Sequence, residues 1–194
     1  MPTLVQPSTQ YQESFLCGAA EFKAEGRLDS TYAAFLGYDL SLLKRDFSGF
    51  VAALLKLFDP DRLPRGWFPD RVLWLIEADE YIGQASIRPE LGTMYLITYG
   101  GHIGYSIRPS KRRVGYGRSI LSLTLAQARA MGLKRVLITC DADNIASKKI
   151  IEANGGGREG HAVMSWFLGS LIFVTMLACF WLTRNAPFRA PQTT

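Results

Sequence analysis

The sequence predicts an α/β fold with a mixed central sheet flanked by helices, followed by a C-terminal hydrophobic helix. Short apolar, strand-like runs alternate with helical patterns through residues 1–160. A basic turn with two glycines, Arg112–Gly117, joins one such strand directly to a helix. An uncharged apolar run, residues 162–183, follows the domain and precedes a short basic tail, residues 184–194. These features predict one globular domain over residues 1–160, one hydrophobic segment and a short tail.

The first half of the domain is predicted to be mainly helical. A short strand is expected at Pro2–Val5, and Ser8 then caps a helix that stops at Gly26. Residues 39–58 carry apolar side chains at helical spacing, with polar residues between them. The prolines of residues 60–69 end this helix and start a loop.

The second half is predicted to alternate strands and helices. Asp79-Glu80 is expected to form a hairpin turn between two strands. The predicted elements are the strands Val72–Ala78, Ile82–Arg88, His102–Ile107 and Arg135–Cys140, and the helices Ser119–Met131 and Asn144–Asn154.

Composition excludes several classes of function. The formal net charge is +5 and the sequence pI is about 9.2, with no basic patch beyond Lys111–Arg118. Nucleic-acid binding is therefore not predicted. The spacing of Cys17, Cys140 and Cys179 fits neither a metal site nor a disulfide framework. No metal site is therefore expected, and the domain is expected to lie in a reducing environment. The N-terminus has no signal-peptide pattern.

The basic turn has the features of a phosphate site. The first N–H groups of the following helix have no partners inside it, and the helix dipole adds positive charge there. Gly115 and Gly117 allow close approach of an anion, and Arg112, Arg113 and Arg118 add donors that suit phosphate. The glycine spacing fits neither the dinucleotide loop nor the Walker loop. The sequence therefore predicts a phosphorylated small molecule as ligand.

Two ordered strings resemble the GNAT superfamily of N-acetyltransferases. Arg112-Arg-Val-Gly115-Tyr-Gly117 looks like its R/Q-x-x-G-x-G/A acetyl-CoA pyrophosphate loop. The strings 100–117 and 138–156 are similar to one bacterial subgroup of predicted acetyltransferases. The resemblance implies a GNAT-like acyl-CoA N-acyltransferase fold over residues 1–160, with acetyl-CoA as co-substrate.

The resemblance also implies which residues contact the cofactor. Main-chain groups of the strand before the turn would hold the pantetheine arm and the thioester oxygen. The N–H groups of Arg113 through Arg118 would hold the pyrophosphate. Asn144 matches the family asparagine that contacts the cofactor arm, and a plain helix N-cap is its alternative role. The expected cofactor-binding residues are Ser106, Ile107, Arg108, Arg112, Arg113, Val114, Gly115, Tyr116, Gly117, Arg118, Asn144 and Ser147.

Three residues are candidates for proton transfer. His102 has an ordinary pKa that suits a general base, with a hydrogen bond in the turn beside Gly101 as its slightly favoured alternative. Glu77 is a second candidate base, with surface solvation as its alternative. Many GNAT enzymes carry a tyrosine acid seven residues after the asparagine, where this chain has Ile151. Tyr105 or solvent is therefore expected to protonate the leaving thiolate, and water alone is an alternative base.

Residues 162–183 predict a membrane-spanning or hydrophobic helix. The 22 uncharged residues would form a helix of roughly 33 Å, enough for a ~30 Å hydrocarbon core. Trp166 and Trp181 lie near its two ends, where interfacial aromatics are common. Two alternatives stay open, replacement of the last strands of the sheet and an aberrant tail. The expected localisation is a cytoplasmic catalytic domain, with this segment as its anchor.

The predicted function is acetyl-CoA-dependent N-acetylation of a small-molecule or peptide amine. The alternative is a catalytically idle, membrane-tethered CoA-binding or scaffold protein, because the usual acid position and the final strands depart from the family pattern. Neither the acceptor nor the oligomeric state follows from the sequence.

Overall fold

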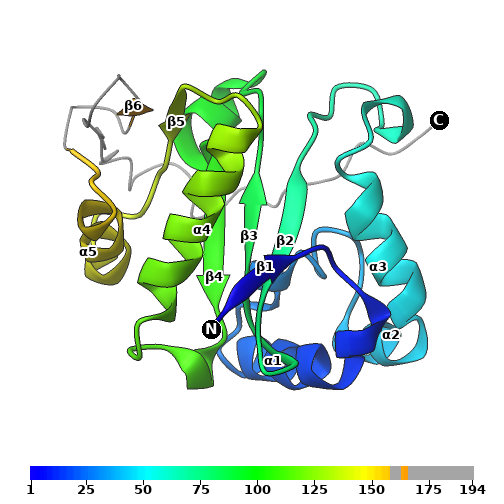
Figure 1. Cartoon of the computed structure of the whole chain (residues 1–194). Coiled ribbons are helices and arrows are strands. Elements are labelled where there is room, and N and C mark those ends of the chain that lie inside the picture. Colours follow the sequence, from blue (N-terminus) through cyan, green and yellow to red (C-terminus); the bar gives the residue numbers. More distant parts are fainter. Residues whose placement is uncertain (158–162, 166–194) are drawn as a thin grey trace.

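A four-stranded antiparallel sheet in the order β1-β2-β3-β4 forms the centre of the protein (Figure 1). The computed structural model describes residues 1–157 and 163–165. The strands of the central sheet are β1 (Thr3–Val5), β2 (Arg71–Glu77), β3 (Glu80–Ile87) and β4 (Ile103–Ile107). A second antiparallel pair consists of β5 (Arg135–Leu137) and β6 (Val163–Ser165).

Helices cover the central sheet, and α4 crosses over β3 and β4 in Figure 1. The α-helices are α1 (Gln12–Ala24), α2 (Leu40–Arg45), α3 (Phe47–Lys56), α4 (Tyr116–Ala130) and α5 (Ile145–Ala153). The shorter turns are η1 (Thr9–Tyr11), η2 (Leu28–Thr31), η3 (Pro60–Arg62), η5 (Pro109–Lys111) and the π-helical η4 (Leu96–Gly100).

Alternation along β2 divides the core into two layers. Trp74 is fully buried and packs on the α1–α3 face, where its ring stacks on Phe15 with centroids 4.7 Å apart. Its neighbours Leu73 and Leu75 are buried on the opposite face, against α4 residues such as Leu121. Successive strand residues point to opposite faces, so one strand supplies both layers.

The predicted helix over residues 39–58 is interrupted once. Asp39 caps α2 by accepting from the N–H of Leu42, and Asp46 caps α3 by accepting from the N–H of Gly49 at 2.9 Å. The side chain of Asp46 thus starts a new helix inside an apolar pattern that runs through both. The predicted order of the elements from β1 to α5 is otherwise confirmed.

The prediction of a mixed sheet is wrong for the described residues, whose strand pairings are all antiparallel. The chain crosses from β4 through α4 to β5, but the two strands meet only where β4 begins. There, the N–H of His102 donates to the carbonyl of Leu137 at 2.7 Å. No described backbone hydrogen bond links residues 103–107 with residues 138–144. The outer edge of β4 therefore stays open, and this opening positions the candidate site.

The start of the predicted C-terminal helix is also corrected. Val163–Ser165 form β6 and pair with Arg135–Leu137, because β5 presents an edge whose backbone groups need partners. The rest of the predicted segment, residues 162 and 166–183, and the tail, residues 184–194, lie outside the described residues. None of the helices within residues 1–157 is long and apolar enough to cross a membrane.

Candidate functional site

Five consecutive backbone N–H groups at the start of α4 have no acceptor among the described residues. They belong to Arg113–Gly117, and we call this segment the cradle. The next N–H, that of Arg118, already donates to the carbonyl of Gly115 at 3.0 Å. The cradle therefore ends one residue earlier than the sequence predicts. Such a run of free donors at a helix N-terminus is suited to an anion.

Both glycines of the cradle are required by its geometry. Gly115 is the N-cap of α4 with φ 99°, a conformation that side chains of other residues disfavour. Gly117 lies against α5, where a Cβ would come within 2.5 Å of Cδ1 of Ile150. One glycine sets the turn of the chain, and the other lets α4 pack closely on α5.

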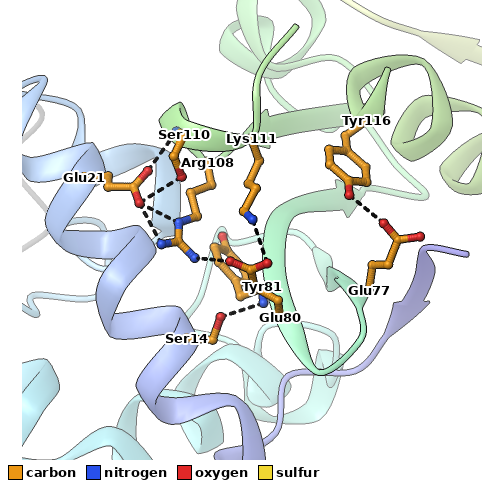
Figure 2. Close-up of polar contacts among 9 residues, drawn as sticks. All are labelled: Ser14, Glu21, Glu77, Glu80, Tyr81, Arg108, Ser110, Lys111 and Tyr116. Atoms are coloured by element: carbon orange, nitrogen blue, oxygen red, sulfur yellow. Dashed lines mark hydrogen bonds and ion pairs between the residues drawn. The ribbon is translucent and has the colours of Figure 1, made fainter. Parts of the chain in front are cut away.

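Ion pairs within the protein occupy two of the arginines that the sequence assigns to the cofactor. Arg112 makes a bidentate pair with Glu25, each N–O distance being 2.9 Å. Arg108 pairs with Glu21 at 2.7 Å and with Glu80 at 3.2 Å, as Figure 2 shows. The side chains of these arginines are therefore held by the protein itself, contrary to the prediction that they bind the cofactor.

The two arginines left for an anion are Arg113 and Arg118. Both are exposed, and neither side chain makes an ion pair or hydrogen bond with a described residue. Val114 lies between them in sequence and is 69% exposed. Two unpaired guanidinium groups beside five free N–H groups make this end of the molecule a strong anion site.

The open edge of β4 presents main-chain groups of alternate residues. Arg88 N–H donates to the carbonyl of His102, and Arg108 N–H to that of Ile82, so even-numbered residues of β4 face β3. The N–H and C=O groups of Tyr105 and Ile107 must then point to the open edge. The carbonyl of Ile107 accepts a hydrogen bond from Nε of Arg112 at 3.0 Å. Only the N–H of Ile107 therefore remains available at the open edge.

This ladder changes which main-chain groups could contact a cofactor. Ser106 bonds within the sheet through its main chain, and its hydroxyl donates to the carbonyl of Ser30 at 2.8 Å. Arg108 is likewise bonded to β3. The assignments of Ser106 and Arg108 do not fit the geometry, whereas Ile107 fits and Tyr105 joins it.

The side chain of Tyr105 lies between β4 and α5. Its hydroxyl oxygen is buried and has no described group in hydrogen-bonding geometry, although the Ser147 hydroxyl is near enough to favour ionisation slightly. Burial dominates and raises the pKa of Tyr105 to about 12. The group is therefore a protonated donor near neutral pH, next to the open edge.

The start of α5 lies on the same side of the opening. Asn144 caps the helix by accepting from the N–H of Ser147 at 3.0 Å, so its structural role is established. Ile151, at the family's acid position, is fully buried in the core beneath α4. Isoleucine at that position has no acidic proton to donate, so an acid from another residue stays a prediction.

The geometry of His102 favours its structural role. Its Nδ1 accepts from the N–H of Leu137 at 2.8 Å, so a proton on the neutral ring resides on Nε2. Burial, together with the positive charge of Arg88, lowers the pKa of His102 below its ordinary value of 6.5. The imidazole joins β4 to β5 and has no free basic nitrogen.

Glu77, the second candidate base, lies at the opposite end of the central sheet from His102. It pairs with Glu80 at one end of β3, while Ile87 at the other end pairs with Ile103. The seven residue steps of β3 separate these ends by roughly 23 Å at about 3.3 Å per residue. Glu77 accepts a 2.5 Å hydrogen bond from Tyr116, which lowers its pKa (Figure 2). The hydrogen bond between Glu77 and Tyr116 instead attaches the start of α4 to the end of β2.

The sequence from residue 51 to residue 156 matches the family model of the acetyltransferase (GNAT) domain. This match spans more than half of the 194 residues. The chain belongs to the GNAT family of acetyltransferases. It is therefore an acetyl-CoA-dependent acetyltransferase, and the GNAT resemblance noted in the sequence is confirmed.

Two solved structures share the GNAT fold with this chain. One is the microcin self-immunity acetyltransferase MccE with acetyl-CoA and AMP, at 18% identity, covering 79% of this chain and 77% of its own. The other is RimL, a ribosomal-protein alpha-N-acetyltransferase with coenzyme A, at 16% identity, covering 79% and 78%. The TM-score is 0.54 for each. No curated protein matches the sequence significantly.

Sequence reasoning missed the acidic partners of the GNAT turn. Glu21 lies in the last turn of α1 and Glu25 is the C-cap of that helix, and their i, i+4 spacing places them on one side of the helix end. Nothing local links that side to a turn more than 80 residues later. Among the described residues, no group of three or more His, Cys, Asp or Glu side chains could hold a metal ion.

Replacing His102 should separate its structural role from a basic one. His102→Ala should lower stability by about 1–3 kcal/mol, because the buried N–H of Leu137 loses its acceptor. His102→Asn should recover much of this, since its Oδ1 can accept the same bond. Thermal melts at several pH values would test the assignment.

The pH dependence of these melts has a defined sign. The lowered pKa means that His102 contributes stability above its ordinary pKa of 6.5, and that this contribution is lost as the pH falls through the lowered value. The asparagine variant should lack this loss. An alanine variant as stable as the wild type at pH 8 would refute the structural role.

Proposed function

We propose that this protein transfers the acetyl group of acetyl-CoA directly to the nitrogen of a primary amine. The observation that carries the proposal is the cradle of free N–H groups, which opens directly beside the unpaired edge of β4. One element binds phosphate and the other offers main-chain partners to an extended chain. Coenzyme A has both a pyrophosphate and an amide-containing arm, and it supplies an activated thioester carbonyl.

The residues of the site fit this cofactor in charge and in hydrogen-bonding capacity. The N–H groups of Arg113–Gly117 would receive pyrophosphate oxygens, and Arg113 and Arg118 would balance their charge. The main-chain groups of Tyr105 and the N–H of Ile107 would bond the pantetheine amides, as an added strand would. Asn144 and Ser147, at the start of α5 near Tyr105, would contact the arm of the cofactor.

Tyr105 is the proposed acid. When the amine nitrogen attacks the acetyl carbonyl carbon, the carbon–sulfur bond breaks and the thiolate needs a proton. The Tyr105 hydroxyl is protonated, and the Ser147 hydroxyl lies near it without meeting ordinary hydrogen-bonding geometry. Tyr105 would thus supply the proton that the isoleucine at position 151 cannot donate.

No dedicated base is proposed. His102 uses its basic nitrogen to hold Leu137, and Glu77 is bound to Tyr116. Positioning the amine against the thioester supplies much of the rate enhancement without a base. Proton loss from the amine to water then suffices, and the rate should rise with pH as more of the amine becomes neutral.

The acceptor class is an amine on a peptide or small molecule. RimL is an α-N-protein acetyltransferase and MccE a self-immunity acetyltransferase, and both share the fold of this chain. An idle scaffold role gains no support, because Tyr105 is a candidate acid although the usual tyrosine position is occupied by Ile151. The free N–H groups of the cradle and the open edge of β4 support the proposed cofactor half of the site.

A screen of amines against the full-length protein tests this proposal. Acetyl-CoA and each amine are incubated with the enzyme, and released thiol is measured with a chromogenic disulfide, with mass spectrometry of the acceptor as the second readout. Thiol release that requires the amine, together with an acetylated product, is the expected result. Acetyl-CoA binding without transfer to any amine class would favour the idle alternative.

A further inference from the structure

The segment that leads into the cradle is held by two glutamates at the C-terminal end of α1, Glu21 in its last turn and Glu25 at its C-cap. Glu21 accepts from Nε of Arg108 at 2.7 Å and from the backbone N–H and hydroxyl of Ser110 at 2.9 and 3.0 Å. Glu25 holds Arg112 through two 2.9 Å contacts. Figure 2 shows Glu21 facing the turn from α1. Residues 108–112 are therefore bonded to a helix that is distant in sequence.

A third carboxylate completes the attachment from the β2–β3 hairpin. Glu80 lies between Arg108, at 3.2 Å, and Lys111, at 2.6 Å (Figure 2). The side chain of Arg108 is only 12% exposed, so its ion pairs are screened less than surface pairs. Arg112 and Glu25 are 35% and 38% exposed, which makes theirs the weaker attachment.

These contacts end where the cradle begins. The residue after Arg112 is Arg113, whose φ of 67° is unusual for a residue with a side chain. Such a conformation persists when its surroundings determine it. Bonds to Ser110 and Arg112 fix the direction in which the chain enters Arg113, and so aim the N–H groups that follow.

The glutamates also set the charge of the site. Between them, Glu21, Glu25 and Glu80 neutralise Arg108, Lys111 and Arg112. Without them, three further cations would be free beside the cradle and could draw phosphate away from the N–H groups. The paired arrangement leaves Arg113 and Arg118 as the cations next to the donors.

We infer that Glu21 and Glu25 are positioning residues for the pyrophosphate of the cofactor, which they do not touch. The inference rests on the proposed use of the cradle. Both glutamates precede the residues matched by the family model, 51–156, so this attachment belongs to the chain's own N-terminal region. Cofactor affinity should therefore depend on a helix outside the matched GNAT region.

Charge-removing variants of α1 test the inference in the full-length protein. Glu21→Gln and Glu25→Gln are compared with Glu13→Gln, an exposed glutamate at the other end of α1 that makes no hydrogen bond or ion pair with a described residue. Three ligands are titrated by calorimetry or NMR: acetyl-CoA, 3′-phospho-ADP, which keeps the pyrophosphate, and acetyl-pantetheine, which lacks it. Thermal melts confirm that each variant is folded.

The inference predicts a loss confined to ligands that contain pyrophosphate. Glu21→Gln should raise Kd for acetyl-CoA and 3′-phospho-ADP about tenfold, as loss of a charge-assisted contact would. Glu25→Gln should give a smaller loss in the same direction, and acetyl-pantetheine should bind all variants equally. Because the Glu25 pair is exposed, that variant keeps the test valid even if Glu21→Gln does not fold.

Two results would overturn the inference. One is wild-type affinity of the variants for acetyl-CoA, and the other is an equal loss of affinity for acetyl-pantetheine, which would indicate a general structural defect. Either result leaves the proposed function intact if the wild type binds acetyl-CoA. A wild type that binds none of the three ligands refutes the proposed function itself.

Discussion

Replacing Gly117 by tryptophan should lower the affinity for acetyl-CoA by about a hundredfold. A Cβ at this position already comes within 2.5 Å of Ile150, and an indole cannot fit between α4 and α5. The first turn of α4 must move, which disperses the N–H groups of the cradle. The loss of two charge-assisted hydrogen bonds of about 1.5 kcal/mol each would account for the hundredfold decrease in affinity. Calorimetric titration with acetyl-CoA measures it.

The matched control places the same bulk elsewhere on the helix. Ala126→Trp adds an indole to an exposed position of α4, more than two turns beyond the cradle, and should bind acetyl-CoA like the wild type. Gly117→Ala should lie between the two, because the end of the Ile150 side chain can shift. Equal affinity of Gly117→Trp and the control would show that the cofactor binds somewhere else.

Removing the hydroxyl of Tyr105 should reduce kcat by about a hundredfold or more, the usual contribution of a positioned general acid. The buried hydroxyl makes no hydrogen bond of ordinary geometry with a described residue, so Tyr105→Phe should fold normally and keep its KM for acetyl-CoA. Since the pKa of Tyr105 is raised to about 12, the acid stays protonated across the working range. The alkaline side of the wild-type pH profile should therefore show no decline from this group.

Tyr81 offers the control for this substitution. Its hydroxyl is likewise buried and has no hydrogen-bond partner among the described residues, but its ring packs against Phe15 on the α1 face of the sheet. Tyr81→Phe should leave kcat unchanged. Wild-type kcat in Tyr105→Phe would assign protonation of the thiolate to solvent.

Features that depend on neighbouring residues could be predicted from the sequence. The order of strand, basic turn and helix around Gly115 and Gly117 is encoded by residues that lie together in the chain. The cap at Asn144 is of the same kind, because its partner Ser147 is three residues away. The family itself followed from these short strings.

Features that depend on distant contacts could not. Arg112 looks like a phosphate ligand until Glu25 is placed beside it by the fold. Ser106 looks like a cofactor contact until strand register turns its main chain toward β3. His102 looks like a base until Leu137 takes its Nδ1. In each case a partner more than 20 residues away determines the role of the side chain.

The predicted mixed sheet was wrong for a related reason. Hydrophobic runs locate β4 and β5, but they do not show whether the two strands keep bonding after they meet. Here the contact between His102 and Leu137 is followed by an opening. The predicted helix over residues 162–183 was wrong at its start, where Val163–Ser165 complete the pair with β5.

Titration of the full-length wild-type protein with acetyl-CoA by calorimetry tests the central claim most directly. The cradle and the open edge of β4 predict saturable binding at one site, with an affinity that falls as salt screens Arg113 and Arg118. Competition by 3′-phospho-ADP should accompany it. A folded protein that shows no heat of binding would contradict the assignment of the basic glycine turn to coenzyme A.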